Sequence, residues 1–186
     1  LYITDTISGD IESILSYLRQ TTSIDDWIGT TGIGICTKGT EYFDRPAAVA
    51  MVAQLPENSF CIFSALLDKA EELDKETKEW IKNHTAPFGI IHGDPNNQNS
   101  ANLIEDLGKI TSGFMVGGFT ASRSEHPQIA TDVTGSGISG ALFSPNVEVA
   151  TGLTQGCLPV GQTHIVSDCL DNIIFSLNGE NALEVF

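Results

Sequence analysis

The apolar positions of this chain follow the same order twice. Each half begins with a short apolar strand, continues with a helix whose apolar residues recur every three or four positions, and returns to an apolar run that contains glycine. Two further apolar runs complete each half. In the first half these segments span residues 1–5, 10–20, 27–34, 47–55 and 60–67. In the second half they span residues 88–92, 100–111, 114–120, 138–143 and 147–153.

The first strand and the glycine run of each half start about 25 residues apart, which is the length that a strand, a three-turn helix and a return strand require. The pattern therefore predicts an α/β (mixed α+β) fold, with duplicated β-α-β-β-β units forming mixed sheets flanked by helices. We expect a single domain with pseudo-repeats at about residues 1–67 and 88–153. A charged surface helix at residues 68–83 joins them, and residues 161–166 and 172–177 close the chain as strands.

Turn residues indicate how some of these segments connect. Pro56-Glu57-Asn58 separates residues 47–55 from residues 60–67, so these two runs are expected to form a hairpin. Residues 123–137 are polar and rich in glycine, and their length is typical of a functional loop.

Charge and composition exclude several classes of partner. The net charge is −15, from 24 acidic and 9 basic residues. This balance argues against nucleic acid and against anionic membrane surfaces as partners. No apolar run approaches the ~20 residues that span a bilayer. The four cysteines form no C-x-x-C pair, so we expect reduced thiols in a cytoplasmic protein. The chain starts inside a strand without an initiator methionine, and we interpret it as a piece of a longer protein.

Several motifs carry a family resemblance. Gly156-Cys-Leu-Pro-Val-Gly161, His164-Ile-Val-Ser167 and Leu177-Asn-Gly179 occur in this order near the C-terminus, after Phe114-Met-Val-Gly-Gly-Phe-Thr-Ala-Ser122 and its earlier copy Trp27-Ile-Gly-Thr-Thr-Gly32. The ordered set resembles the FIST N-terminal domain, named for F-box and intracellular signal transduction, over nearly the whole chain. The sequence departs from the family at Ser167, where threonine is usual, and at Asn181, where proline is frequent.

The resemblance implies an intracellular sensory domain of a signal transduction protein rather than an enzyme. The implied ligand is a small molecule such as an amino acid. The implied partners are a FIST C-terminal domain, which we expect to be missing from this chain, and a signalling output protein or domain. The resemblance also leaves open a haem-binding nitric oxide sensor. Haem would need an axial histidine, and the four histidines (His84, His92, His126 and His164) each have a structural interpretation as well.

Two glycine-bearing runs and one strand end supply the candidate ligand site. Glycine turns can expose backbone N–H groups to an anion, although glycine can also merely relieve crowding between strands. Arg123 could bind a carboxylate or instead pair with Glu125 at the surface. We expect the two glycine runs to approach one cleft, with the strand end at His92 beside it. The candidate residues are Gly29, Thr30, Thr31, His92, Asp94, Asn97, Gly117, Gly118, Thr120, Ser122 and Arg123.

One further motif suggests an enzyme. Residues His92-Gly-Asp94-Pro-Asn-Asn-Gln-Asn99 match the pattern H-G-D-x-x-x-x-N of small-molecule phosphotransferases, in which aspartate orients a hydroxyl and asparagine holds magnesium. That chemistry also needs a nucleotide-binding lobe, whereas residues 1–91 repeat the pattern of the second half. We therefore expect a turn rather than a catalytic loop, with no catalytic residue, no metal and no turnover.

Overall fold

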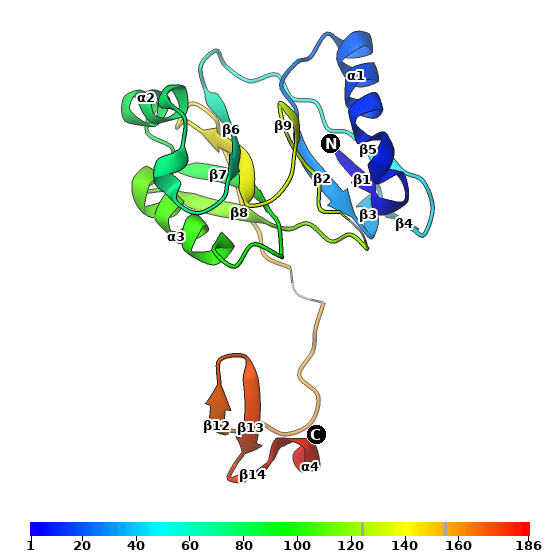
Figure 1. Cartoon of the computed structure of the whole chain (residues 1–186), viewed down its shortest axis with the longest axis vertical. Helices are drawn as coiled ribbons and strands as arrows, with labels where there is room; N and C mark the ends of the chain where they lie inside the picture. Colours follow the sequence, from blue (N-terminus) through cyan, green and yellow to red (C-terminus); the bar gives the residue numbers. More distant parts are fainter. Residues whose placement is uncertain (124, 155) are drawn as a thin grey trace. The chain divides into compact units, whose positions relative to one another are not determined.

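The computed structural model describes residues 1–123, 125–154 and 156–186. These residues form two units, Leu1–Val149 and Ala150–Phe186, which Figure 1 draws from blue to yellow and from orange to red. None of the helices in the described ranges is long and apolar enough to cross a membrane. The mixed α/β fold predicted from the sequence is confirmed.

A βαβ unit organises the first sheet. Strands β1 and β2 are parallel neighbours, and α1 connects them after a short 3-10 helix, η1. Three antiparallel strands extend the pair, giving the order β10-β9-β2-β1-β5. The elements are β1 (Tyr2–Thr4), η1 (Asp5–Asp10), α1 (Ile11–Thr22), β2 (Ile28–Gly32), β5 (Ala48–Val49), β9 (Gln128–Ala130) and β10 (Asp132–Thr134).

A second βαβ unit organises the second sheet. Strands β7 and β8 are parallel neighbours connected by α3, and β11 and β6 continue the sheet antiparallel in the order β6-β11-β7-β8. The elements are β6 (Phe60–Leu66), η2 (Ala70–Glu72), α2 (Lys75–His84), β7 (Phe88–Gly93), α3 (Ser100–Thr111), β8 (Phe114–Phe119) and β11 (Ile138–Phe143). A separate hairpin consists of β3 (Gly34–Thr37) and β4 (Thr40–Phe43).

The helices cover the outer sides of the two sheets. Figure 1 shows α1 beside the first sheet, and α2 and α3 beside the second. The apolar residues of α1 recur at helical spacing and pack with Leu1, Ile3 and Trp27, while α3 packs its Leu103 and Leu107 against the second sheet. Because the helices cover the outer faces of the sheets, the polar side chains on the other faces contact one another between the two sheets.

Several predicted connections are wrong. Residues 47–55 and 60–67 do not form a hairpin, because β5 pairs with β1 in the first sheet and β6 pairs with β11 in the second. Residues 147–153 contain no strand, and the predicted functional loop at 123–137 contains β9 and β10. The apolar pattern indicates strands, but the choice of partner depends on contacts far along the sequence.

The predicted repeat is only partly visible in the pairing. Both halves contain a βαβ unit with parallel neighbouring strands. The strands that follow differ, because β3 and β4 pair with each other whereas β9 and β10 join the first sheet. The duplication of a whole β-α-β-β-β unit therefore stays a prediction. The helix predicted between the halves is confirmed as α2, which Asp74 caps by accepting a hydrogen bond from the Thr77 amide at 2.8 Å.

The second unit is a small antiparallel sheet with the order β12-β13-β14. Its elements are β12 (Val166–Leu170), β13 (Ile173–Leu177), β14 (Glu180–Asn181) and α4 (Ala182–Val185). The strand predicted at 172–177 and the Asn178-Gly179 turn are confirmed, whereas the strand predicted at 161–166 is displaced to β12. The hairpin turns at Asp171, whose φ of 51° is typical of tight turns.

Candidate functional site

Polar side chains from both βαβ units meet between the two sheets. The Tyr2 hydroxyl lies 2.9 Å from His92 Nε2, and the hydroxyls of Thr30 and Thr120 lie 2.6 Å apart. Since the Thr30 hydroxyl donates to the Pro127 carbonyl at 3.0 Å, the Thr120 hydroxyl donates to Thr30. We call this group the polar seam, and with two more buried partners it comprises Tyr2, Thr30, His92, Thr120, Gln128 and Ser139.

The seam continues into buried contacts between β9 and β11. The Ser139 hydroxyl donates to Gln128 Oε1 at 2.5 Å, and Gln128 Nε2 donates to the Gly137 carbonyl at 3.2 Å. Both side chains are fully buried. Buried polar pairs of this kind stabilise the fold only in one geometry, so they fix how the first sheet lies on the second.

His92 is neutral at physiological pH. Burial, and after it the positive charge of the Leu1 α-amino group, lower the pKa of its imidazole to about 4. Burial also raises the pKa of the Tyr2 hydroxyl, so the pair is a hydrogen bond between two neutral groups.

Three buried polar atoms have no hydrogen-bond partner within the described residues. They are Asp5 Oδ1, Thr31 Oγ1 and His92 Nδ1. Asp5 directly follows β1, Thr31 is the penultimate residue of β2, and His92 is the penultimate residue of β7. All three therefore lie at the carboxyl ends of parallel strands, where α/β folds commonly bind ligands. Buried polar atoms nearly always have a partner, which makes this edge a candidate binding site.

Arg123 joins the same edge from the segment after β8. Its backbone N–H donates to Asp5 Oδ2 at 3.1 Å, and its guanidinium lies 3.5 Å from Asp5 Oδ1 and 2.5 Å from Asp44 Oδ1. The pairing with Glu125 considered from the sequence is therefore replaced by pairing with two aspartates. The Asp5 side chain is only 5% exposed, whereas those of Arg123 and Asp44 are 51% and 74% exposed.

The segment after β7 forms a turn. Asp94 Oδ1 accepts a hydrogen bond from the Asn96 amide at 2.9 Å and lies 3.7 Å from His126 Nδ1. The side chains of Asn97 and Asn99 donate to the Leu67 carbonyl and to Asp68. In the ranges described, no group of three or more His, Cys, Asp or Glu side chains could hold a metal ion. The side chains of Asp94, Asn97 and Asn99 in the H-G-D-x-x-x-x-N motif thus bind protein groups of this loop and of neighbouring segments.

Two of the candidate glycines have a structural role. A Cβ atom at Gly29 would collide with the Leu1 carbonyl oxygen, and one at Gly117 would collide with the Ile91 carbonyl oxygen. Glycine therefore lets neighbouring parallel strands approach in both sheets, as the crowding interpretation expects. Gly118 differs, because a Cβ there would meet no heavy atom within 4 Å. Ser122 is half-buried in the segment between Thr120 and Arg123.

The other histidines make contacts within the protein. The His84 ring stacks on Trp80 at 5.1 Å, and its Nδ1 lies 3.1 Å from the Trp80 carbonyl. His126 contacts the loop after β7, and His164 Nδ1 lies 2.9 Å from Asn178 Nδ2 in the second unit. These contacts are the structural roles considered for the histidines, and none of them favours haem.

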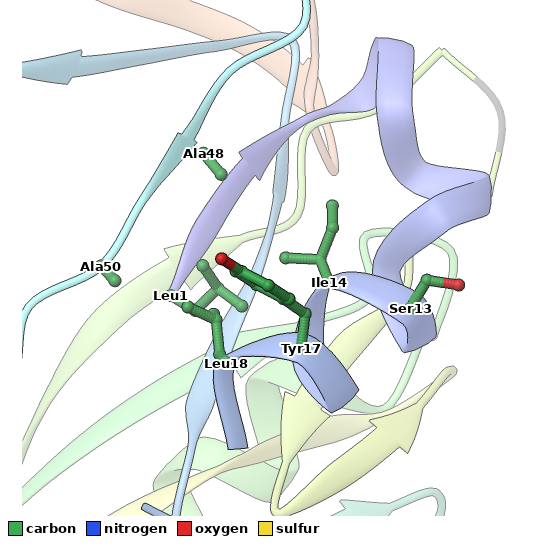
Figure 2. Close-up of a pocket in the computed structure, with 7 residues that line it drawn as sticks. All are labelled: Leu1, Ser13, Ile14, Tyr17, Leu18, Ala48 and Ala50. Carbon is green, nitrogen blue, oxygen red and sulfur yellow. The ribbon is translucent and has the colours of Figure 1, made fainter. Parts of the chain in front are cut away.

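An apolar pocket of about 430 Å³ lies on the other side of the first sheet, between α1 and β5 (Figure 2). Figure 2 shows Tyr17 lying across it, with the Ser13 hydroxyl pointing away from the other labelled side chains. Its lining residues are Leu1, Ser13, Ile14, Tyr17, Leu18, Ala48 and Ala50. None of the candidate ligand residues lines this pocket, and few polar groups could orient a ligand there.

The fold and the seam together define a mixed α/β domain with a polar edge shared by two βαβ units. The FIST N domain matches residues 1–180, so this chain belongs to the FIST N family. FIST N domains are sensory domains of signal transduction proteins, and membership implies association with FIST C or signalling domains. No curated protein and no solved structure matches the chain.

The Thr30–Thr120 contact gives a first prediction. Replacing either threonine with valine should destabilise the fold by about 1–2 kcal/mol, because each change leaves a buried polar group without its partner. The double variant should cost less than the sum, with a coupling of about 1 kcal/mol in a double-mutant cycle measured by urea denaturation. Thr40→Val, at an exposed position of β4, is the control and should change little. Strict additivity would show that the two hydroxyls do not interact.

Proposed function

We propose that this chain binds a small ligand at the carboxyl ends of β1, β2, β7 and β8, and that it senses the ligand without turnover. The observation that carries the proposal is the group of three buried polar atoms at this edge that have no hydrogen-bond partner among the described residues: Asp5 Oδ1, Thr31 Oγ1 and His92 Nδ1. A ligand with polar groups would offer these atoms the hydrogen bonds that burial otherwise denies them.

The charges at the edge favour a ligand with both an ammonium and a carboxylate group. Asp5 presents a buried carboxylate oxygen that accepts no hydrogen bond from the described residues, and Arg123 presents a guanidinium fork beside it. An amino acid carries both groups on its α-carbon and would match the pair. This geometry supports the amino acid class among the small ligands implied by the family.

Ligand entry would require Arg123 to leave Asp44. Both side chains are more than half exposed, and exposed ion pairs contribute only about 0–1 kcal/mol. A ligand carboxylate could therefore replace Asp44 at small cost, whereas Asp5 would stay in place because it is buried. Arg123 would then connect the ligand to the end of β1, and binding would couple the first sheet to the segment after β8.

The proposal is tested by measuring thermal stability in the presence of each of the twenty amino acids, followed by calorimetry. A ligand that binds the folded chain raises the melting temperature by mass action. Arg123→Gln should raise Kd at least about tenfold, because a charge-assisted contact is lost, and Asp5→Asn should do the same if it holds an ammonium group. Arg45→Gln is the matched control, since Arg45 packs on the Tyr42 ring instead.

The outcome separates sensing from catalysis. We expect the amino acid to be recovered unchanged after incubation with the chain, with and without nucleotide and magnesium. Conversion that is lost in Asp94→Ala would overturn the proposal in favour of an enzyme. If none of the twenty amino acids shifts the melting temperature of the chain, the amino acid proposal is wrong.

A further inference from the structure

Within the first unit, Leu1–Val149, strand β8 is an open and unusually apolar edge of the second sheet. It is the last strand in the order β6-β11-β7-β8, and its sequence, Phe114-Met-Val-Gly-Gly-Phe119, contains no charged residue and no proline. Phe114 is 61% exposed and Phe119 is 54% exposed. Sheet edges are usually protected by charges, prolines, bulges or short length, and β8 has none of these.

The edges of the first sheet are better protected. β5 contains two residues, and β10 contains three, of which Asp132 forms an ion pair with Arg19. At the other edge of the second sheet, β6 buries Phe63 and Leu66 and leaves one of its seven residues exposed. Among the edge strands of these two sheets, β8 is thus the one that is long, uncharged and exposes large apolar side chains.

The hydrogen bonds to β7 show which backbone groups of β8 remain open. The Phe114 amide donates to the Pro87 carbonyl at 2.9 Å, and the Thr120 amide donates to the Gly93 carbonyl at 2.8 Å. Because successive residues of a strand point their backbone groups to opposite sides, even-numbered residues face β7. The N–H and C=O groups of Met115, Gly117 and Phe119 therefore point to the open side.

We propose that β8 pairs antiparallel with β8 of a second copy of this chain, centred on Gly117. The three outward residues are spaced symmetrically about Gly117, so this register matches Met115 with Phe119 of the second copy and Gly117 with Gly117. Each of these pairs exchanges two hydrogen bonds. A register centred on Val116 would leave Phe119 without an outward-facing partner within β8.

The side chains of β8 fit the same register. Met115 would lie opposite Phe119 of the second copy, a favourable sulfur–aromatic pair, and Val116 would lie opposite Gly118, so a large residue faces a small one. Because β8 contains no charged residue, pairing two copies of it would bring no like charges opposite each other, although the chain has a net charge of −15. The strand is thus complementary to itself, and this self-complementarity favours a second copy as the occupant.

An apolar pocket beside β8 would be covered in the same assembly. It has a volume of about 310 Å³, and its lining includes Ile91, Ile104, Met115, Gly117 and Phe119. The outward residues of β8 and the pocket share the face that α3 covers. The Phe119 and Met115 side chains of the second copy would therefore lie on this same face of the sheet, next to the pocket.

Sedimentation velocity of the 186-residue chain over a range of concentrations tests the proposal. We expect a reversible dimer whose Kd rises at least about tenfold in Phe119→Lys, because a charge would have to be buried against Met115 of the other copy. Tyr17→Lys, an equal change of charge at a 65% exposed position of α1, should leave Kd unchanged. A chain that stays monomeric at every concentration, or a dimer that Phe119→Lys does not weaken, would overturn the proposal.

Cysteine cross-linking tests the register. In a background with the four native cysteines replaced by serine, the pair Val116→Cys and Gly118→Cys should give a disulfide-linked dimer, since these positions face each other across the centre. Gly118 has room for the new side chain. Val116→Cys alone should remain unlinked. Efficient linking by Val116→Cys alone would place Val116 at the centre and overturn the proposed register.

Discussion

The Gly117→Ala variant is expected to lose about 3 kcal/mol or more of folding stability. Gly117 has a φ of 150°, a conformation that residues with a side chain rarely adopt. Its new Cβ would also collide with the Ile91 carbonyl oxygen, and Ile91 is itself buried in the core beneath α3. Relief would require β7 and β8 to separate, which would weaken their hydrogen bonds. Urea denaturation at a fixed low protein concentration measures the loss.

Gly118→Ala is the matched control for this prediction. The two glycines are adjacent in β8, but a Cβ at Gly118 meets no heavy atom within 4 Å. We expect a change within about 0.5 kcal/mol, since alanine restricts the unfolded chain and meets no obstacle in the folded one. Gly29→Ala should instead behave like Gly117→Ala, because its Cβ would meet the Leu1 carbonyl. Equal stability of the Gly117 and Gly118 variants would contradict the role assigned to close strand approach.

The sequence predicts the local elements of this fold well. The strand at the start of each half, the helix that follows it and the apolar return strand all appear, since each needs only a periodic apolar pattern. The hairpin expected from residues 47–67 is wrong, because a periodic apolar pattern indicates a strand but does not indicate its partner. Both runs do contain strands, but the second one pairs with β11, which lies far along the chain. A turn signal between two strands therefore does not establish that they pair, because strand pairing depends on contacts far apart in the sequence.

The candidate site was predictable to a similar extent. Thr30 and Thr120, both expected near one cleft, do lie in hydrogen-bond contact, and His92 lies at the neighbouring strand end. Asp5 was missed, although it is the buried partner of Arg123. The two residues are separated by 118 positions, and an aspartate after a short strand has no local signature that distinguishes it from a capping residue. Knowing that β1 and β2 are parallel would have pointed to it, because ligands gather at such strand ends.

Acid should destabilise the wild-type chain through His92. The folded-state pKa is about 4, below the ordinary value of 6.5 expected for the unfolded chain. Between these two values the unfolded chain binds a proton that the folded chain does not, so stability is complete above about pH 6.5 and is lost as the pH falls toward 4. The difference between the two pKa values corresponds to about 3 kcal/mol. Protonation would also place a charge between the sheets, next to the Tyr2 hydroxyl and the Leu1 α-amino group.

The pH dependence of His92→Gln isolates this effect. Glutamine can still hydrogen-bond the Tyr2 hydroxyl but does not titrate, so the variant should lose about 3 kcal/mol less than the wild type between pH 7 and pH 4. The carboxylates contribute to both chains and cancel in the comparison. His164→Gln, in an exposed part of the second unit, should retain the wild-type acid dependence. Parallel stability curves for wild type and His92→Gln would show that His92 titrates normally, and the assignment of a buried neutral imidazole to the seam would then fail.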